Sequence, residues 1–307
     1  MYSISQIRDG VQNPKLACRD LNKKYYSFKN SNPYNDDGID IFDEDWDNLI
    51  ILDACRYDLF ESVSSIEGDL SKKASRGSHT LEFLKGNFKN RDLSDTVYVT
   101  ASPMYYRHRE ELDAGIWAVD HVWMNDGWDN ETQTVLPETV TSAALDRISD
   151  NPDKRLLVHF LQPHYPFVTS DYKFDKGTIE DEDTHSSFWR DILTGKLDVE
   201  VEMIWELYRE NLELVLSEVR RLINNIHGKT VITSDHGNML GERCNPIPIR
   251  EFGHPPGVHT SELVEIPWLE LPYEQRRKIT KGNDGEGHIK TQESEQVKEK
   301  MKNLGYL

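Results

Sequence analysis

The sequence predicts an α/β protein with a doubly wound, mostly parallel central sheet that is flanked by helices. Three observations lead to this prediction. Short runs of β-branched and aliphatic residues recur along the chain, segments with helical apolar periodicity lie between them, and two of the runs end in acidic residues. Strands that alternate with helices are typical of parallel sheets, because each crossover helix covers one face of the sheet.

Five runs are expected to form strands, namely residues 48–53, 96–100, 155–161, 230–234 and 263–269. One helix is expected from Pro137 to about residue 149, since proline suits the first turn of a helix. A longer helix is expected over roughly 200–226, where apolar residues repeat at helical spacing. Gly228 is expected to stop this helix. A shorter helix is expected after the turn at Gly77.

Composition divides the chain into three parts. Residues 1–45 are mostly polar and rich in turn-forming residues, so we expect a loop-rich lead-in. Residues 46–272 are expected to form the α/β domain, with the acidic stretch 171–200 as a surface insertion near the site or as a solvated loop. Residues 273–307 are expected to be a charged tail that ends in a short helix.

The charge balance limits the kinds of partner. The chain of 307 residues has 54 acidic against 36 basic residues and a net charge of −18, which argues against a nucleic-acid-binding surface. Such an acidic surface suits either an ordinary acidic protein or one adapted to high salt. No run approaches ~18 apolar residues, and the N-terminal residues do not resemble a signal peptide. We therefore expect a soluble cytoplasmic protein without a membrane segment.

The three cysteines do not indicate a disulfide framework or a zinc finger. They are Cys18, Cys55 and Cys244, with no Cys-x-x-Cys spacing. Cys55 follows a buried strand, so it is expected to be a small core residue and not a nucleophile.

Two predicted strands deliver metal-binding side chains to the carboxyl edge of the sheet. Asp53 follows residues 48–52, and Asp235 and His236 follow residues 230–234. Ligands of open α/β sheets bind at this edge. Carboxylate oxygens together with an imidazole nitrogen suit a divalent metal ion. Plainer explanations remain, because Asp53 could cap the next helix and the Asp-His pair could be a solvated turn.

A candidate nucleophile lies between the first two predicted strands, in the segment Gly77-Ser78-His79-Thr80. A hydroxyl group at the start of a helix faces the positive end of the helix dipole, where anions also bind. A metal ion can activate such a hydroxyl group by lowering its pKa. The alternative is that Ser78 or Thr80 only caps the helix.

Four motifs, in this order, resemble the sulfatase-like branch of the alkaline phosphatase superfamily: NLIILDACRYD, GSHTLEFL, HFLQPHYPF and VITSDHGNMLGE. Weaker matches are GHPPGVHTSELVEIPWL and the terminal MKNLGYL. The resemblance implies metal ligands at Asp53, Asp235 and His236. It also implies a nucleophile at Thr80, which touches the metal as the alkoxide, with Ser78 as the less favoured alternative.

The same resemblance implies four candidate residues for contact with the substrate. Arg56 matches the Arg that follows the first-strand Asp, with a structural ion pair as the alternative. His164 matches a substrate-contacting His, with simple packing as the alternative. His254 and His259 compete for a single role in the late His segment.

Two departures from the family pattern narrow the prediction. Sulfatases carry Cys-x-Pro-x-Arg, whose Cys is converted to formylglycine, whereas Cys55 is followed by Arg-Tyr-Asp-Leu. Two-zinc phosphodiesterases add an Asp and two His, whereas the mid-chain segment offers His159 and His164 without a matching Asp. The pattern is similar to one-metal, threonine-nucleophile members, which include phosphoglycerol and phosphoethanolamine transferases.

The expected function is that of a metal-dependent phosphoester hydrolase or phosphotransferase that acts on a small anionic ester through a covalent Thr80 intermediate. The ligand set favours one Zn²⁺ or Mn²⁺ ion, with Ca²⁺ and Mg²⁺ as alternatives. Two other functions stay open. One is a sulfuric ester hydrolase without formylglycine, and the other is a metal- or anion-binding homologue without turnover.

Overall fold

The computed structural model describes residues 13–124, 127–170 and 187–282. The strands of its main sheet are β1 (Asn48–Leu52), β2 (Asp69–Ala74), β3 (Asp92–Thr100), β4 (Gly115–His121), β7 (Arg155–Phe160), β8 (Thr230–Ser234) and β11 (Glu265–Glu270). They form a seven-stranded sheet in the order β2-β11-β8-β1-β7-β3-β4. All five predicted strands therefore lie in one sheet, as expected.

The sheet is mostly parallel. β1 pairs in parallel with β7 and β8, and β3 pairs in parallel with β7 and β4. β11 is antiparallel to both β8 and β2. Two small antiparallel ribbons lie outside the sheet: β5 (Trp128–Asp129) with β6 (Thr134–Val135), and β9 (Met239–Arg243) with β10 (Arg250–Gly253).

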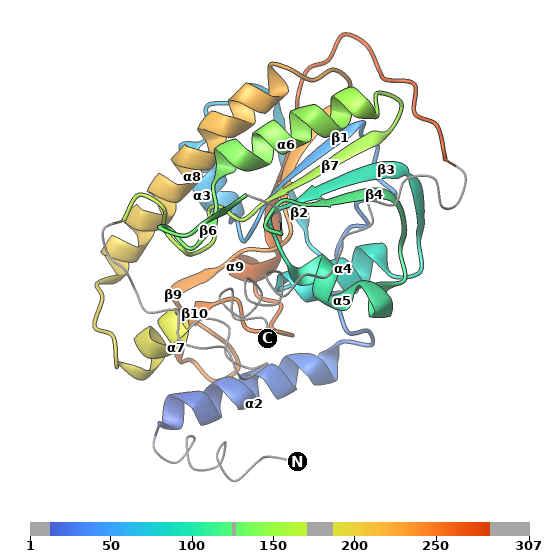
Figure 1. Cartoon of the computed structure of the whole chain (residues 1–307). Coiled ribbons are helices and arrows are strands. Elements are labelled where there is room, and N and C mark those ends of the chain that lie inside the picture. The colour runs from blue at the N-terminus through green and yellow to red at the C-terminus, as the bar shows by residue number, and fades with distance from the viewer. Residues whose placement is uncertain (1–12, 125–126, 171–186, 283–307) are drawn as a thin grey trace.

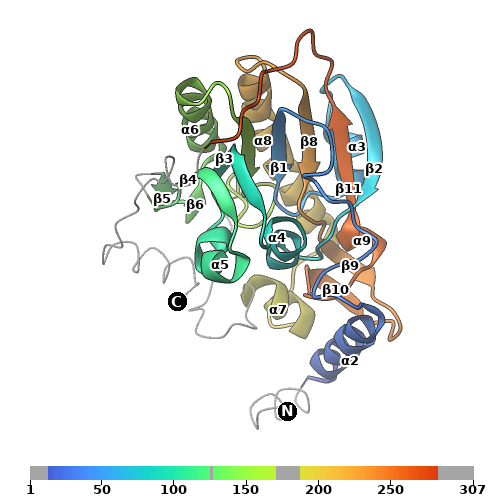
Figure 2. The same ribbon diagram turned by 90° about the vertical axis from the view of Figure 1, so that its right-hand side faces the viewer.

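Helices cover both faces of the sheet, as Figures 1 and 2 show. α3 (Tyr57–Val63), α6 (Pro137–Asp150) and α8 (Val201–Ile223) pack on one face, and α4 (Thr80–Phe88) and α5 (Met104–Leu112) pack on the other. Alternate residues of β1 enter the two cores, with Ile50 and Leu52 on the α8 side and Leu49 and Ile51 on the α4 side. This arrangement confirms the doubly wound α/β fold.

The two strands of the main sheet that the sequence did not predict are β2 and β4, which form its edges. β2 is a largely exposed edge strand with the sequence DLSKKA, and such a polar strand lacks the apolar run on which the prediction depended. β4 begins at Gly115. Its buried residues Ile116 and Ala118 alternate with Trp117 and Val119, which are only partly buried. Both strands are held by pairing to a neighbour, which a single sequence does not reveal.

The predicted helices that fall within the described residues are present, with one difference at an end. α6 begins at Pro137 as expected. α8 ends at Ile223, before the end expected near residue 226. Gly228 has φ +102°, and a Cβ atom there would lie 2.6 Å from Asp47 Oδ2, so this glycine serves the turn into β8.

The N-terminal part differs from the loop-rich lead-in expected for residues 1–45. α2 (Pro14–Lys29) begins after Asn13, whose side chain accepts a hydrogen bond from the Lys15 N–H group at 3.3 Å. Polar composition concealed this helix, because the side of it that packs on the protein is itself polar and includes the buried Asn22.

The acidic stretch and the tail are partly outside the described residues. Residues 171–186, with the run Glu-Asp-Glu-Asp, and residues 283–307, with the expected terminal helix, are not described. The second part of the stretch is not a solvated loop, because α7 (Ser187–Thr194) buries Phe188 and Trp189. The first part of the tail packs on the domain, where Arg276 holds the Asp47 carboxylate with two hydrogen bonds of 2.8 and 2.9 Å.

Within the described ranges, no helix combines the length and the apolar composition that a bilayer span requires.

Candidate metal centre

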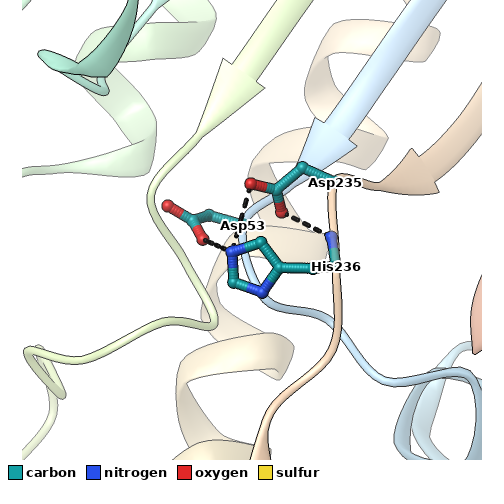
Figure 3. Close-up of side chains that lie close together, drawn as sticks. All are labelled: Asp53, Asp235 and His236. Carbon is teal, nitrogen blue, oxygen red and sulfur yellow. Dashed lines mark hydrogen bonds and ion pairs between the residues drawn. The ribbon is translucent and has the colours of Figure 1, made fainter. Parts of the chain in front are cut away.

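The register of β1 and β8 brings three predicted ligands together. Leu52 lies opposite Ser234 in this parallel pair, so the next residues, Asp53 and Asp235, leave the sheet side by side. His236 Nε2 lies 3.5 Å from Asp53 Oδ1 and 3.4 Å from Asp235 Oδ2. One ligand atom from each residue lies within 4.8 Å of the others (Figure 3). The expected convergence at the carboxyl edge is confirmed.

The donor atoms fit a divalent cation. Asp53 Oδ1 and Asp235 Oδ2 are buried and have no partner in hydrogen-bonding geometry. His236 Nδ1 lies 2.7 Å from the Gly237 carbonyl oxygen, which can only accept, so Nδ1 carries the proton. The lone pair of His236 Nε2 therefore points toward the two carboxylates. Two buried carboxylates and a lone pair in one place are costly unless a cation lies between them.

Burial is the main cause of the pKa shifts of Asp53, Asp235 and His236. Burial raises the pKa of Asp53 well above its usual value, and the nearby Asp235 raises it further. Burial also raises the pKa of Asp235, although His159 and the N–H groups of Ala54 and His236 oppose this. Burial lowers the pKa of His236 to about 4. A bound cation reverses this balance, since it favours ionised carboxylates and a neutral imidazole.

The backbone after β1 is held in an uncommon conformation at the site. Ala54 has φ +59°, in the left-handed region that non-glycine residues rarely adopt. Its N–H group donates to Asp235 Oδ1 at 3.0 Å, and its carbonyl oxygen accepts from the Tyr208 hydroxyl at 2.5 Å. These bonds fix the turn and hence the direction of the Asp53 side chain.

Thr80 is the hydroxyl residue that lies beside the cluster. It is the first residue of α4, and its Oγ1 is 3.4 Å from His236 Nε2. The Ser78 hydroxyl lies instead between Glu82 Oε2 at 2.9 Å and the Pro255 carbonyl at 3.1 Å. The geometry therefore separates the two candidates for the nucleophile.

The structure also separates the two late histidines. The His254 ring lies 4.7 Å from the His236 ring between centroids, and His254 Nε2 is 2.8 Å from His164 Nε2. The ring nitrogens of His259 contact other residues, with Nε2 3.2 Å from Glu82 Oε2 and Nδ1 2.8 Å from Asn30 Nδ2. His164 and His254 are thus brought to the cluster, and His259 is not.

Arg56 has the surroundings of a structural residue. Its guanidinium forms ion pairs with Asp58, at 2.6 Å, and with Glu242, and it donates to the Asn238 carbonyl at 3.1 Å. It also stacks over the Trp205 ring at 4.6 Å from the centroid. These contacts match the ion-pair alternative for Arg56 and leave its predicted substrate contact without support.

His159 on β7 lies closer to the cluster than the sequence indicated. Its Nε2 is 3.7 Å from Asp235 Oδ2 and has no hydrogen-bond partner, while its Nδ1 is 3.0 Å from the Tyr98 hydroxyl. Burial lowers the pKa of His159 to about 4. The sequence offered one signal, because a His one residue before the carboxyl end of a buried strand must lie near the same edge as Asp53.

Glu82 was missed, although it joins two segments of the site. Its carboxylate accepts the Ser78 and Gly257 N–H groups at 2.9 and 2.6 Å and contacts His259. Burial alone would raise the pKa of Glu82, but the His259 hydrogen bond and the other partners hold it at about 2. The signal was its position three residues after the capping residue His79, where Glu is favoured.

Cys55 is buried and its N–H group donates to Ser234 Oγ at 2.9 Å. Burial raises the pKa of its thiol well above the usual value. A thiol of this kind packs and does not react.

Neither a protein-family model nor a curated protein matches the sequence. Several solved structures are similar in arrangement. Lipooligosaccharide phosphoethanolamine transferase A (EptA), an integral membrane protein from Neisseria meningitidis, is 12% identical with a TM-score of 0.45, over 73% of this chain and 47% of that one. The C-terminal periplasmic domain of EptC from Escherichia coli, in complex with Zn, is 13% identical with a TM-score of 0.47, over 79% of this chain and 77% of that one.

A putative sulfatase, yidJ from Bacteroides fragilis, is 18% identical with a TM-score of 0.27, over 48% of this chain and 33% of that one. Phosphoethanolamine transferases and sulfatases are the kinds of protein that the sequence motifs resemble. Likenesses of this size assign no function to this chain.

Proposed function

We propose that the protein is a metal-dependent phosphoester hydrolase or phosphotransferase with Thr80 as its nucleophile. The observation that carries the proposal is the position of Thr80 Oγ1, 3.4 Å from a ligand nitrogen of a buried Asp53-Asp235-His236 cluster. A hydroxyl group without an activating neighbour is a weak nucleophile, and this one lies where a cation would be held.

A divalent cation at this cluster, with Zn²⁺ or Mn²⁺ favoured by the oxygen and nitrogen donors, would lower the pKa of an adjacent hydroxyl group and offset charge on a phosphoryl oxygen. The protein holds the cation and stabilises negative charge on the nucleophile. Asp53, Asp235 and His236 hold the cation, and the turn at Ala54 fixes the two carboxylates. Thr80 opens α4, so charge that develops on Oγ1 lies at the positive end of that helix dipole.

In the proposed reaction the Thr80 Oγ–P bond forms as the bond between phosphorus and the ester oxygen breaks. The Thr80 proton ends on the departing alcohol, by way of His164 and His254, whose Nε2 atoms lie 2.8 Å apart. Water, or an acceptor alcohol, then cleaves the Oγ–P bond and returns a proton to Thr80. The substrate is proposed to be a small anionic ester, and the choice between hydrolysis and transfer is set by the acceptor.

Sulfate ester hydrolysis has less support. Cys55 is buried and is followed by Arg-Tyr-Asp-Leu, not by the Cys-x-Pro-x-Arg pattern of a formylglycine site. A homologue that binds a metal but does not turn over substrate differs from the proposed enzyme only in the behaviour of Thr80.

Steady-state kinetics on aryl phosphate monoesters, aryl phosphate diesters and aryl sulfates, with Zn²⁺ or Mn²⁺ added back, test the proposal. Thr80→Ala should lower kcat by about 10³-fold or more, because a covalent nucleophile is lost. Ser78→Ala is the matched control and should retain most activity, since that hydroxyl group is bound to Glu82 and Pro255. If Thr80→Ala is active while Cys55→Ser is dead, the proposal is wrong. If the wild type cleaves only aryl sulfates, phosphoryl transfer is wrong.

A further inference from the structure

The outward face of α2 carries a stripe of exposed apolar side chains. Leu21, Tyr25 and Phe28 are 53%, 40% and 93% exposed, and among the described residues the other large hydrophobic side chain with comparable exposure is Tyr273. Spacings of four and three residues place the three side chains on one face of the helix. A stripe of this kind favours an apolar environment that covers it.

The same face is basic, although the chain as a whole is strongly acidic. Lys24 and Lys29 are exposed beside the stripe, and Lys29 Nζ lies 4.9 Å from the centre of the Tyr25 ring. The acidic residue of α2, Asp20, is not among its exposed positions. The exposed face of α2 therefore combines apolar groups with positive charge and presents no exposed carboxylate.

The opposite face fixes α2 to the protein, so its orientation is determined. Arg19 Nε lies 2.8 Å from Glu251 Oε1, and Arg19 Nη2 donates to the Phe252 carbonyl at 2.8 Å. The Asn22 amide exchanges hydrogen bonds of 2.9 and 2.8 Å with the backbone of Ile247. Because these bonds hold the helix against β9 and β10, the apolar stripe cannot turn inward without breaking them.

α2 lies at the end of the molecule that holds the candidate site. Figure 2 shows it beyond β9 and β10, away from the body of the sheet. Asn30 follows the helix and contacts His259, which in turn contacts Glu82, two residues from Thr80. A surface that received the stripe would thus lie on the site's side of the protein.

We propose that α2 is an interfacial helix that seats the protein on an anionic lipid surface. Leu21, Tyr25 and Phe28 enter the boundary between headgroups and acyl chains, and Lys24 and Lys29 meet the anionic headgroups. Apolar residues flanked by lysines, without exposed acids, are the pattern of helices that lie in this boundary. The basic face also explains how a protein of net charge −18 approaches such a surface in one orientation.

Co-sedimentation of the full chain with phospholipid vesicles tests the proposal without any turnover, so its result is independent of the role of Thr80. The wild type should bind vesicles that contain anionic lipid more tightly than neutral vesicles, and added salt should weaken the binding. Phe28→Ser should weaken binding by about tenfold or more, because one large apolar side chain no longer leaves water. Replacing both Lys24 and Lys29 by Gln should remove the preference for anionic lipid.

Tyr273→Ser is the matched control, since Tyr273 is 47% exposed and lies near Arg276, which binds Asp47 at the other end of the sheet. This variant should bind vesicles as the wild type does. Equal binding by the wild type and Phe28→Ser, or no binding by the wild type, overturns the proposal. A wild-type dimer in light scattering that Phe28→Ser converts to a monomer also overturns it, because the stripe would then be a contact between two copies of the chain.

Discussion

Asp53 and Asp235 are buried carboxylates, and their charge has to be balanced inside the protein. Asp235 Oδ1 accepts the N–H groups of Ala54 and His236 at 3.0 and 2.9 Å, which orients the carboxylate without neutralising it. Its Oδ2 faces the Nε2 atoms of His236 and His159 at 3.4 and 3.7 Å. The residues thus supply anionic and neutral donors to one point, which is the physical basis of the proposed cation site.

We predict that Asp235→Asn loses stoichiometric metal while it keeps the fold. The Asn side-chain oxygen can still accept both N–H groups, but the charge that attracts the cation is gone. Metal analysis after reloading with Zn²⁺ or Mn²⁺ gives the answer. Asp58→Asn is the control, because Asp58 is largely exposed and pairs with Arg56, and it should keep the metal.

In metal-free protein the same substitution should raise the free energy of unfolding, because it removes one of two buried carboxylates that repel each other. Chelator should lower the melting temperature of the wild type and leave that of Asp235→Asn unchanged. A variant that still binds one equivalent of metal as tightly as the wild type would contradict the ligand assignment.

His121, at the end of β4, should contribute to acid sensitivity away from the candidate site. Burial, together with the smaller effect of the nearby Arg109, lowers its pKa to about 4. Because the folded-state pKa lies below the unfolded value, the unfolded state binds the extra proton, and stability is lost as the pH falls from about 6.5 to about 4. His121→Gln should therefore remove about 2 kcal/mol of the stability difference between pH 7 and about pH 4.5.

Chemical denaturation of both proteins at the two pH values measures this effect. The control is His227→Gln, since the His227 side chain is exposed. Equal pH dependence in His121→Gln and the wild type would show that His121 is not buried in its neutral form.

At the level of elements, the turn between β2 and α4 decides where Thr80 lies. A Cβ atom at Gly77 would overlap the Phe83 backbone nitrogen and lie 2.7 Å from the His79 carbonyl oxygen. The turn therefore closes tightly on the first turn of α4, and this close approach is possible only with glycine. Glu82 then ties the turn to the segment of Gly257 and His259.

We predict that Gly77→Ala lowers the free energy of unfolding by about 1–3 kcal/mol, as overpacking of a closed site does. It should also lower kcat, because Thr80 is displaced from His236. Gly115→Ala is the control, since the nearest atom to an added Cβ there is 3.7 Å away. Denaturant unfolding and kinetics on one substrate test both effects. Unchanged stability and kcat in Gly77→Ala would mean that the turn does not position Thr80.

The elements that could be predicted from the sequence are those whose own residues show an apolar run or a helical apolar spacing. β1, β7 and β8 are apolar runs because both faces are covered, and α8 shows its buried stripe in its spacing. The edge strand β2 and the helix α2 are polar, and they exist because other segments pair with them or pack on them. Their positions depend on tertiary contacts, which periodicity does not report.

The residues of the candidate site also divide into those that follow a predictable strand and those that loops position. Asp53, Asp235 and His236 were predictable because they lie within two residues of the end of a recognisable strand. The carboxyl ends of parallel strands meet at the same edge of the sheet, which brings the three side chains together. The difference between His254 and His259, and the pairing of Arg56 with Asp58 and Glu242, depend on loop conformations. Loops carry no periodic signal, so the sequence could offer these residues only as alternatives.

In the whole molecule, the candidate metal site lies at one edge of the sheet, and the helix α2, which we propose binds a lipid surface, lies beyond that edge. The Asp53 cluster lies at the carboxyl ends of β1 and β8, while Arg276 closes the opposite end by binding Asp47. The domain limits at residues 46 and 272, the cytoplasmic location and an adaptation to high salt stay predictions. The position of Thr80 beside the Asp53 cluster supports the proposed function, and the overall likeness to other proteins does not.

The most direct test of Thr80 as the nucleophile is to trap the covalent intermediate. Metal-loaded wild type is mixed with an activated aryl phosphate ester, quenched in acid and digested, and the peptide that covers residues 77–85 is analysed by mass spectrometry. We predict a phosphoryl group, or the phosphoryl moiety of the ester, on Thr80. This group should be present in Ser78→Ala and absent from Thr80→Ala and from metal-free protein. Turnover of the ester with the adduct on Ser78, on Cys55 or on no residue of this peptide would contradict it.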